Sequence, residues 1–249
     1  MPRIMKTVIP RIRRSLRERG VLVSLRRSVL LPVHLWREYR SSQSQGGVLP
    51  RSEFDLQHNV DTDGEANGWT HLSDLEIPSA NWIYGRNYAP IEPERFHTIL
   101  SGLQIRYEEF TFVDLGSGKG RALLLASQYP FQRVVGIEFS PQLHGIAQEN
   151  IRRLAGQQKS GPVESVCADF LDFPLPSTPA VFFFFDPCDD PVLKKLLHKI
   201  RESLELGPRT VYVIYVAPTE SKKILLDTTA WLVNITENID RNYRVYRTR

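Results

Sequence analysis

The chain has 249 residues, of which 41% are hydrophobic and 24% are charged. That length is enough for one well-buried α/β domain with an extension. No apolar run approaches the roughly 20 residues needed to span a bilayer, and no signal-peptide pattern begins the chain, so we expect a cytoplasmic protein. Two cysteines, Cys167 and Cys188, fall in or beside expected buried strands and suit a reducing compartment without structural disulfides.

The positive charge is concentrated at the start of the chain. Residues 1–40 carry 11 Lys or Arg against 2 acids, whereas residues 41–249 carry 21 against 26. We expect residues 1–45 to form a basic, amphipathic helical extension whose apolar stripe packs on the rest of the protein. A contact of this extension with nucleic acid or with an anionic membrane stays open, and the second would make the protein peripheral to the membrane.

Residues 46–109 are expected to hold a linker, a lid and a leading helix over 93–103. Just before that helix, residues 82–90 form an aromatic stretch, in which Tyr84, Arg86 and Tyr88 are our substrate-side candidates. We expect no metal site. The acidic residues at 61–64 suggest a calcium loop, but that loop requires a glycine and a glutamate where the chain has Ala66 and Leu72.

A glycine-rich turn follows the first expected core strand. Residues 112–120 read Phe-Val-Asp-Leu-Gly-Ser-Gly-Lys-Gly, and a helix-prone segment over 121–126 comes directly after them. This is the strand, turn and helix from which nucleotide-type sites are built. A dinucleotide fingerprint would need its third glycine at position 121, where the chain has Arg121. The spacing therefore disfavours a nicotinamide-dependent oxidoreductase, which we keep as an alternative.

Three further expected strands end in or near an acid. The second runs over 133–138 and ends in Glu138, 18 residues after the last glycine of the turn, where a carboxylate can accept hydrogen bonds from both hydroxyls of a ribose. After a helix over 140–154, the third and fourth expected strands lead to Asp169 and Asp186. Together with Asp114, these acids are expected at one edge of a sheet, the edge at which open α/β sheets bind ligands.

The rest of the chain completes a doubly wound fold. A helix over 190–206, a strand over 210–216, a helix over 220–227 and two closing strands over 231–237 and 243–247 follow one another. The fourth strand is apolar on both faces, as a central parallel strand must be. We predict a Rossmann-like, seven-stranded sheet that is mostly parallel and ends in a C-terminal antiparallel hairpin.

These motifs resemble those of the class I S-adenosylmethionine-dependent methyltransferases, and the span from about Phe54 to the end is similar to bacterial members whose substrates are undefined. The resemblance implies that residues 110–249 form the methyltransferase core, that S-adenosylmethionine is the cofactor, and that the region before the core folds over it as a lid. Asp169 would reach the adenine amino group, and the amide that follows would meet a ring nitrogen. The cofactor-binding residues implied in this way are Asp114, Gly116, Ser117, Gly118, Gly120, Glu138, Phe139, Asp169 and Phe170.

The methyl acceptor is expected beside Asp186 and Pro187, which would be the catalytic pair. Enzymes that methylate planar amines usually continue this motif with a second proline and an aromatic residue, whereas this chain has Cys188 and Asp189. The Pro-Cys pair resembles the cytosine-carbon methyltransferases, in which the cysteine attacks the base. The glycine motif is also similar to the nucleosome-core lysine methyltransferases, but only at the cofactor.

The class of acceptor therefore stays open between a protein amine, a nucleic acid and a small molecule. A cofactor-binding or membrane-associated protein without transfer activity is a further alternative, because the residues after Asp186 depart from the usual motif.

Overall fold

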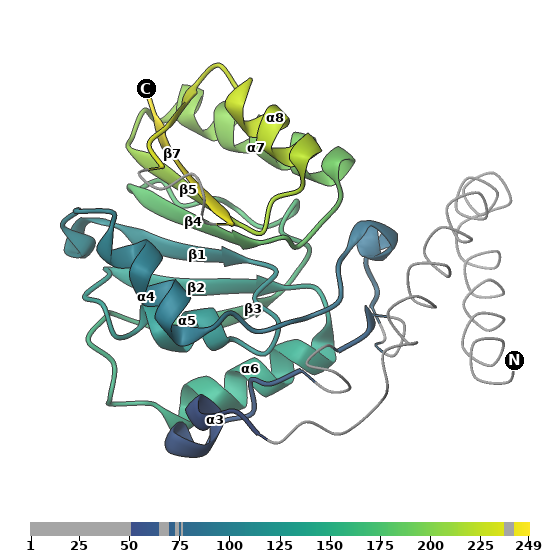
Figure 1. Ribbon diagram of the computed structural model, residues 1–249, viewed down its shortest axis with the longest axis vertical. Helices are drawn as coiled ribbons and strands as arrows, with labels where there is room; N and C mark the ends of the chain where they lie inside the picture. The colour runs from purple at the N-terminus through teal and green to yellow at the C-terminus, as the bar shows by residue number, and fades with distance from the viewer. Residues whose placement is uncertain (1–50, 65–69, 73–74, 76, 237–241) are drawn as a thin grey trace, which may run out of the picture.

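The computed structural model describes residues 51–64, 70–72, 75, 77–236 and 242–249. The expected basic extension, residues 1–45, lies outside them. The described chain builds one seven-stranded sheet, in the order β3-β2-β1-β4-β5-β7-β6 (Figure 1). The strands are β1 (Thr111–Leu115), β2 (Arg133–Glu138), β3 (Val163–Cys167), β4 (Ala180–Phe185), β5 (Val211–Val216), β6 (Leu232–Asn234) and β7 (Tyr243–Thr248).

The sheet confirms the predicted Rossmann-like class. Strands β1 to β5 pair in parallel, whereas β7 is antiparallel to both β5 and β6. The predicted C-terminal hairpin is therefore present, with β7 inserted between β5 and β6. Because the five parallel strands run the same way, their carboxyl ends meet at one edge, and the acids at or just after these ends are brought to that edge.

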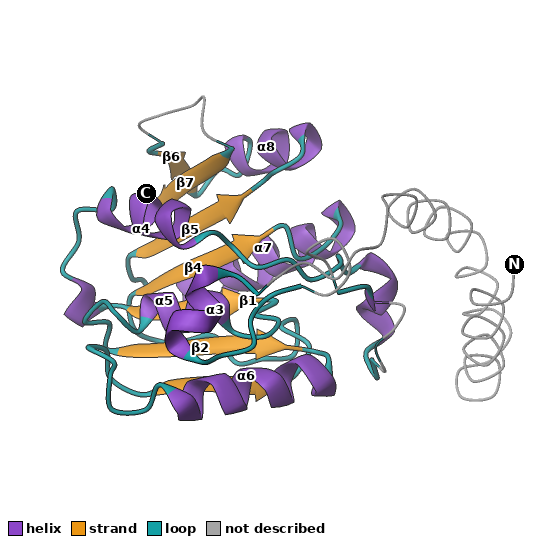
Figure 2. Cartoon of the chain, turned by 60° about the horizontal axis from the view of Figure 1, so that its bottom comes forward, coloured by secondary structure: helices purple, strands orange, loops and turns teal. Residues whose placement is uncertain are grey.

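Helices cover both faces of the sheet (Figure 2). On one face Phe96 of α4 packs against Phe112 and Phe183, and on the other face Leu193 of α7 packs in a cluster with Val113. This alternation explains why the central strands are apolar throughout. The main helices are α4 (Pro93–Ser101), α5 (Arg121–Ala126), α6 (Pro141–Arg153), α7 (Asp190–Leu206) and α8 (Glu220–Asp227), and shorter ones are α3 (Glu53–His58), η2 (Ala80–Tyr84) and η3 (Tyr107–Glu109).

Most expected elements keep their limits to within a residue or two, and the differences have local causes. Helix α4 ends at Ser101, with Gly102 as its C-cap. Strand β3 ends before Asp169, whose carbonyl closes a turn by accepting hydrogen bonds from the amides of Asp172 and Phe173. The expectation of a buried Cys167 was wrong, because β3 is an edge strand and leaves this cysteine exposed.

No helix in the described ranges is both long and apolar enough to cross a membrane.

Candidate active site

The glycine turn joins β1 to α5 and bends the chain through conformations that glycine adopts most easily. Gly116, Gly118 and Gly120 have φ angles of +93°, +54° and +87°. The turn is tied to β2, since the amides of Gly116 and Ser117 both donate to the Ile137 carbonyl, at 2.9 and 3.1 Å. The side chain of Ser117 points at the sheet, where its Oγ lies only 2.6 Å from where a Cβ on Gly136 would be. This hydroxyl is buried without a hydrogen-bond partner among the described residues, and the assignment of Ser117 to the cofactor stays a prediction.

Asp114 is a buried acid whose carboxylate has no hydrogen-bond or ion-pair partner among the described residues. It stands one residue before the end of β1 and is 4% exposed. Burial, together with the neighbouring Glu138 carboxylate, raises the pKa of Asp114 to about 8. Such a group is costly to ionise unless a cation or donor comes to it, so its position points to a positively charged ligand.

Glu138 closes β2 and is 3% exposed. Its two carboxylate oxygens accept hydrogen bonds from the amides of Gly118 and Ser140, each at 2.8 Å. Burial raises the pKa of Glu138 to about 7, although these backbone donors act in the opposite direction. Each carboxylate oxygen has a second lone pair, so the group can still accept ribose hydroxyls. The adjacent Phe139 is half-buried and packs against Leu72 and Leu143.

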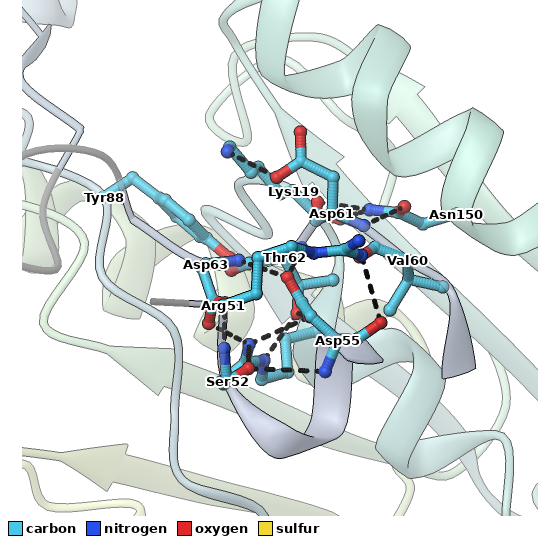
Figure 3. A network of polar contacts seen from close by, with 11 residues as sticks. Arg51, Ser52, Asp55, Val60, Asp61, Thr62, Asp63, Tyr88, Lys119 and Asn150 are labelled. Atoms are coloured by element: carbon cyan, nitrogen blue, oxygen red, sulfur yellow. Dashed lines mark hydrogen bonds and ion pairs between the residues drawn. The ribbon is translucent and has the colours of Figure 1, made fainter. Parts of the chain in front are cut away.

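A chain segment that begins at Ser52, 69 residues before Arg121, braces the helix after the glycine turn. Arg121, the first residue of α5, has a buried guanidinium that stacks 5.1 Å above the ring of Phe54. Figure 3 shows the polar side chains of residues 51–63 that form a polar network. The guanidinium bonds to the side chains of four residues, with distances of 2.6–3.1 Å: Ser52, Asp55, Thr62 and Asp63.

The same segment also holds the turn directly. Lys119 forms a 2.8 Å ion pair with Asp61. Asn150, on α6, is 1% exposed and donates to the carbonyls of both Asp61 and Lys119, at 2.7 and 2.9 Å. Arg121, Asp55, Lys119 and Asn150 were not predicted as functional residues. The available signal was the arginine at the position of a third fingerprint glycine.

Tyr88 lies on the glycine turn, although we had expected it on the substrate side. A Cβ placed on Gly118 would lie 2.0 Å from the Tyr88 ring, so the ring rests directly on this glycine. The Tyr88 hydroxyl donates to the Thr62 carbonyl at 2.6 Å, which joins the ring to the bracing segment (Figure 3). Burial raises the pKa of Tyr88 well above its ordinary value, so the hydroxyl stays a hydrogen-bond donor.

Asp169 receives hydrogen bonds from residues 79–88, which lie in the region where we predicted a lid. We call these residues the lid below. Its Oδ2 accepts from Ser79 Oγ at 2.6 Å and from Asn81 Nδ2 at 2.7 Å, while its Oδ1 accepts from the Leu171 amide at 2.9 Å. The next amide, that of Phe170, donates to no atom in the described part of the chain. This edge therefore offers an acceptor and a donor side by side, as the adenine prediction requires.

Asp186, just after β4, is held by side chains of β5 and α8. Its Oδ1 accepts from the Tyr215 hydroxyl at 3.0 Å and forms an ion pair with Lys222, a fully buried lysine. Its backbone has a φ of +43°, a conformation that a non-glycine residue adopts only under constraint. Pro187 packs on the glycine turn, with its Cβ 2.7 Å from where a Cβ on Gly116 would be.

The lid is paired to the residues that follow β4. Gly85 forms an antiparallel bridge with Cys188, and the amide of Arg86 donates to the Pro187 carbonyl at 3.2 Å. The Arg86 guanidinium contacts both acids of this stretch: Nη2 is 3.0 Å from Asp189 Oδ1, and Nε is 3.6 Å from Asp186 Oδ2. Tyr84 accepts at its carbonyl from the Asp189 amide, at 2.8 Å. The structure therefore brings Tyr84 and Arg86 next to Asp186 and Asp189, and their role on the substrate side stays a prediction.

Cys188 is 2% exposed, and burial raises the pKa of its thiol to about 12. A cysteine nucleophile needs an accessible thiolate, which this environment opposes. The arrangement therefore argues against the cytosine-carbon alternative.

The donor set fits the methyl donor that the motifs indicate. S-adenosylmethionine carries a sulfonium and an ammonium, and Asp114 beside the turn is a buried carboxylate with no partner in the described ranges of the chain. Its ribose and adenine need acceptors and a donor of the kind that Glu138, Asp169 and Phe170 present. No cluster of three or more potential metal ligands occurs among the residues that the structure describes.

The sequence comparison identifies the class. Residues 112–207, from β1 to just past α7, match the model of the methyltransferase domain family. A match of this extent, on a sheet of this order with a glycine turn at its topological switch point, defines a methyltransferase domain. The chain therefore contains a methyltransferase domain, which the match places at residues 112–207. No curated protein is similar enough in sequence to count as a relative.

Solved structures with similar folds include further methyltransferases. A methyltransferase from Pseudomonas syringae is 13% identical, with 62% of this chain and 96% of that chain covered and a TM-score of 0.47. An RNA methyltransferase from Salinibacter ruber in complex with S-adenosyl-L-homocysteine is 18% identical (64% and 92% covered, TM-score 0.43). The tRNA (m1A58) methyltransferase TrmI from Aquifex aeolicus is 17% identical (67% and 72% covered, TM-score 0.46).

Proposed function

We propose that this methyltransferase binds S-adenosylmethionine between Asp114, Glu138 and the turn of Gly116 to Gly120, and methylates a nitrogen or oxygen nucleophile placed beside Asp186. The observation that carries this proposal is the buried, unpartnered carboxylate of Asp114 next to the glycine turn. A buried carboxylate at this position does not stabilise the fold, whereas it can bind a ligand that carries a sulfonium and an ammonium.

The cofactor supplies a methyl group that its sulfonium already activates, so the protein mainly has to align the acceptor and exclude water. Glu138 holds the ribose, and Asp169 with the Phe170 amide holds the base. Tyr88 keeps the turn in its shape by covering Gly118.

Asp186 has a different role, because its Oδ1 is already bonded to Lys222 and Tyr215. Only Oδ2 faces the lid, where Arg86 lies 3.6 Å away. We infer that Asp186 orients the acceptor by accepting a hydrogen bond from its N–H or O–H, and that Pro187 fixes this point against the glycine turn. An acceptor that must lose a proton passes it to solvent or to another base.

Thermal unfolding and calorimetry test cofactor binding. A ligand at 100 times its Kd stabilises a protein by roughly 2.7 kcal/mol, so S-adenosylmethionine and S-adenosylhomocysteine should each raise the Tm by several degrees, and NADH should not. Absence of a shift with both sulfur compounds would overturn the proposal.

The acceptor is open to a direct search. Cell extract separated into protein, RNA, lipid and small-molecule fractions can be incubated with the enzyme and methyl-labelled S-adenosylmethionine, with Asp114→Asn as the matched control. Label in one fraction that depends on Asp114 names the acceptor class. Cofactor binding without label in any fraction favours the alternative of a binding protein without transfer activity.

We also propose a cytoplasmic location, with the basic residues 1–40 in contact with an anionic surface, either a membrane or a nucleic acid. The excess of 11 basic over 2 acidic residues in this stretch supports the contact. Vesicles containing phosphatidylserine and a generic duplex RNA can be compared at two salt concentrations. Failure to bind either at low salt would contradict this part of the proposal.

A further inference from the structure

The turn that follows β3 is held by side chains that have no role in the account above. It runs over residues 169–173, at the end of the site assigned to adenine. From the lid, Ser79 Oγ and Asn81 Nδ2 both donate to Asp169 Oδ2, at 2.6 and 2.7 Å. The lid therefore fixes the orientation of this carboxylate.

The other side of the turn is held by α7. The ammonium of Lys199 donates to the carbonyls of Leu171 and Phe173, at 2.6 and 2.5 Å, and approaches that of Phe170 at 3.5 Å. Burial lowers the pKa of Lys199. A lysine that gives up part of its hydration to contact three carbonyls of one turn fixes the backbone of that turn.

These contacts decide which groups the turn presents to a ligand. Asp169 Oδ2 already accepts two hydrogen bonds and Oδ1 accepts one from the Leu171 amide, which leaves one lone pair on Oδ1. The neighbouring Phe170 N–H is without an acceptor in the described part of the chain. The turn thus offers one acceptor and one donor in adjacent positions.

This acceptor and donor are complementary to adenine but not to hypoxanthine, a base of nearly the same shape. The Watson–Crick edge of adenine has a donor, its amino group, beside an acceptor, its ring nitrogen. Hypoxanthine has a carbonyl acceptor and a ring N–H donor at the same places, so both hydrogen bonds would be lost and a buried polar group left without a partner.

We propose that Ser79 and Asn81 are positioning residues for the base specificity of the cofactor site, acting through Asp169, and that Lys199 holds the turn on which this specificity depends. The inference rests on the proposed cofactor site and goes beyond it, because it makes the lid part of the adenine readout. A lid that only covered the site would affect all ligands of the same shape equally.

The test compares S-adenosylhomocysteine with S-inosylhomocysteine by calorimetry on the full chain. The wild type should prefer the adenosyl compound by about 100-fold, since a site built for a donor and an acceptor rejects the inverted pair. In the double variant Ser79→Ala, Asn81→Ala the preference should fall to about 10-fold or less. Asn87→Ala, a lid residue whose side chain bonds to the Leu72 amide, is the matched control and should keep the full preference.

Single variants extend the test. Asn81→Ala alone should lose part of the preference and serves if the double variant does not fold. Lys199→Met should lower the preference as well, whereas Lys199→Arg, which can still donate to the carbonyls, should restore most of it.

The outcomes separate the two levels of the argument. A wild type that binds neither compound contradicts the proposed function, and with it this inference. A wild type that binds both equally contradicts the adenine assignment alone. If the Ser79 and Asn81 variants lower the affinity for both compounds by the same factor, the preference for the adenosyl compound is unchanged. The two side chains then only hold the lid in place, and the inference is wrong.

Discussion

The four acids at the carboxyl edge of the sheet fall into two pairs with opposite environments. Asp114 and Glu138 are 4% and 3% exposed, form no ion pair within the described residues, and have raised pKa values. Asp169 and Asp186 are more exposed and are already bonded by side chains of the lid, β5 and α8. The first pair becomes favourable to ionise only when a ligand supplies a cation or donors, whereas the second pair is used largely to hold the site in shape.

The largest expected effect is a loss of folding stability when Asp186, a member of the second pair, is replaced. Asp186→Asn leaves the buried ammonium of Lys222 without its counter-ion, and removing one partner of a buried ion pair costs about 3 kcal/mol or more. We expect the free energy of unfolding to fall by about 3 kcal/mol in urea, while the affinity for S-adenosylhomocysteine changes less than about threefold. A large loss of affinity at unchanged stability would place Asp186 with the cofactor pair.

The next effect concerns the glycine turn. Gly118→Ala places a methyl group within 2.0 Å of the Tyr88 ring at a φ of +54°, so the turn or the ring must move. We expect the affinity for S-adenosylhomocysteine to fall by about 100-fold, which is equivalent to 2.7 kcal/mol. Gly156→Ala is the control, because its φ is +85° but nothing lies within 4 Å of the added carbon. Equal losses in both variants would mean that strain alone, without the Tyr88 contact, decides binding.

A third prediction uses pH on the buried pair. A carboxyl group whose pKa is raised keeps its proton in the folded protein but loses it in the unfolded chain, so this pair lowers the free energy of unfolding as pH rises from about 4 to 8. A cationic ligand favours the ionised groups, so cofactor affinity should rise between pH 6 and 8, by up to about tenfold per unit.

Asp114→Asn isolates the contribution of one group. At pH 8 this variant should stabilise the cofactor-free protein by about 1–3 kcal/mol and weaken the binding of S-adenosylhomocysteine. The free energy of unfolding and the affinity should both depend less on pH than in the wild type. The titration of the ligand's own amine is the same for both proteins, so the difference between the two profiles reports Asp114. Identical profiles would show that this carboxyl does not face the ligand.

The smallest effect is expected at the cysteines. Iodoacetamide at pH 8 should alkylate the exposed Cys167 within minutes and leave Cys188 unmodified, as mass spectrometry of the digested protein can show. Cys188→Ser should leave the affinity for S-adenosylhomocysteine within about twofold. Fast alkylation of Cys188 would reopen the cytosine-carbon alternative.

The sequence was sufficient to predict the five parallel strands of the sheet, β1 to β5. Periodicity and the strand-end acids located β1 to β5, because a strand that is buried on both faces leaves a continuous apolar run. The insertion of β7 between β5 and β6 depends on pairing between distant strands, which no local pattern records. The exposure of Cys167 follows from its place on the edge strand, which becomes visible only with the strand order.

The site was predictable where one strand end and its turn form it, and not where distant segments meet. Glu138 stands at the predicted position, but the bonds from Ser79 and Asn81 to Asp169 span about 90 residues of chain. Tyr88 was correctly singled out and assigned to the wrong side, because aromatic composition cannot tell which loop a ring will cover.

The bracing of the glycine turn has a consequence for protein engineering. The family match begins at residue 112, yet the turn inside it is held by Asp55, Asp61 and Tyr88, all of which lie before that point. A catalytic core transplanted from this chain at the limits of the family match would carry the cofactor loop without its support. Chimeras with other methyltransferases should therefore begin the exchanged unit at residue 51 rather than at residue 112, since the donor site is shared between the matched domain and the segment that precedes it.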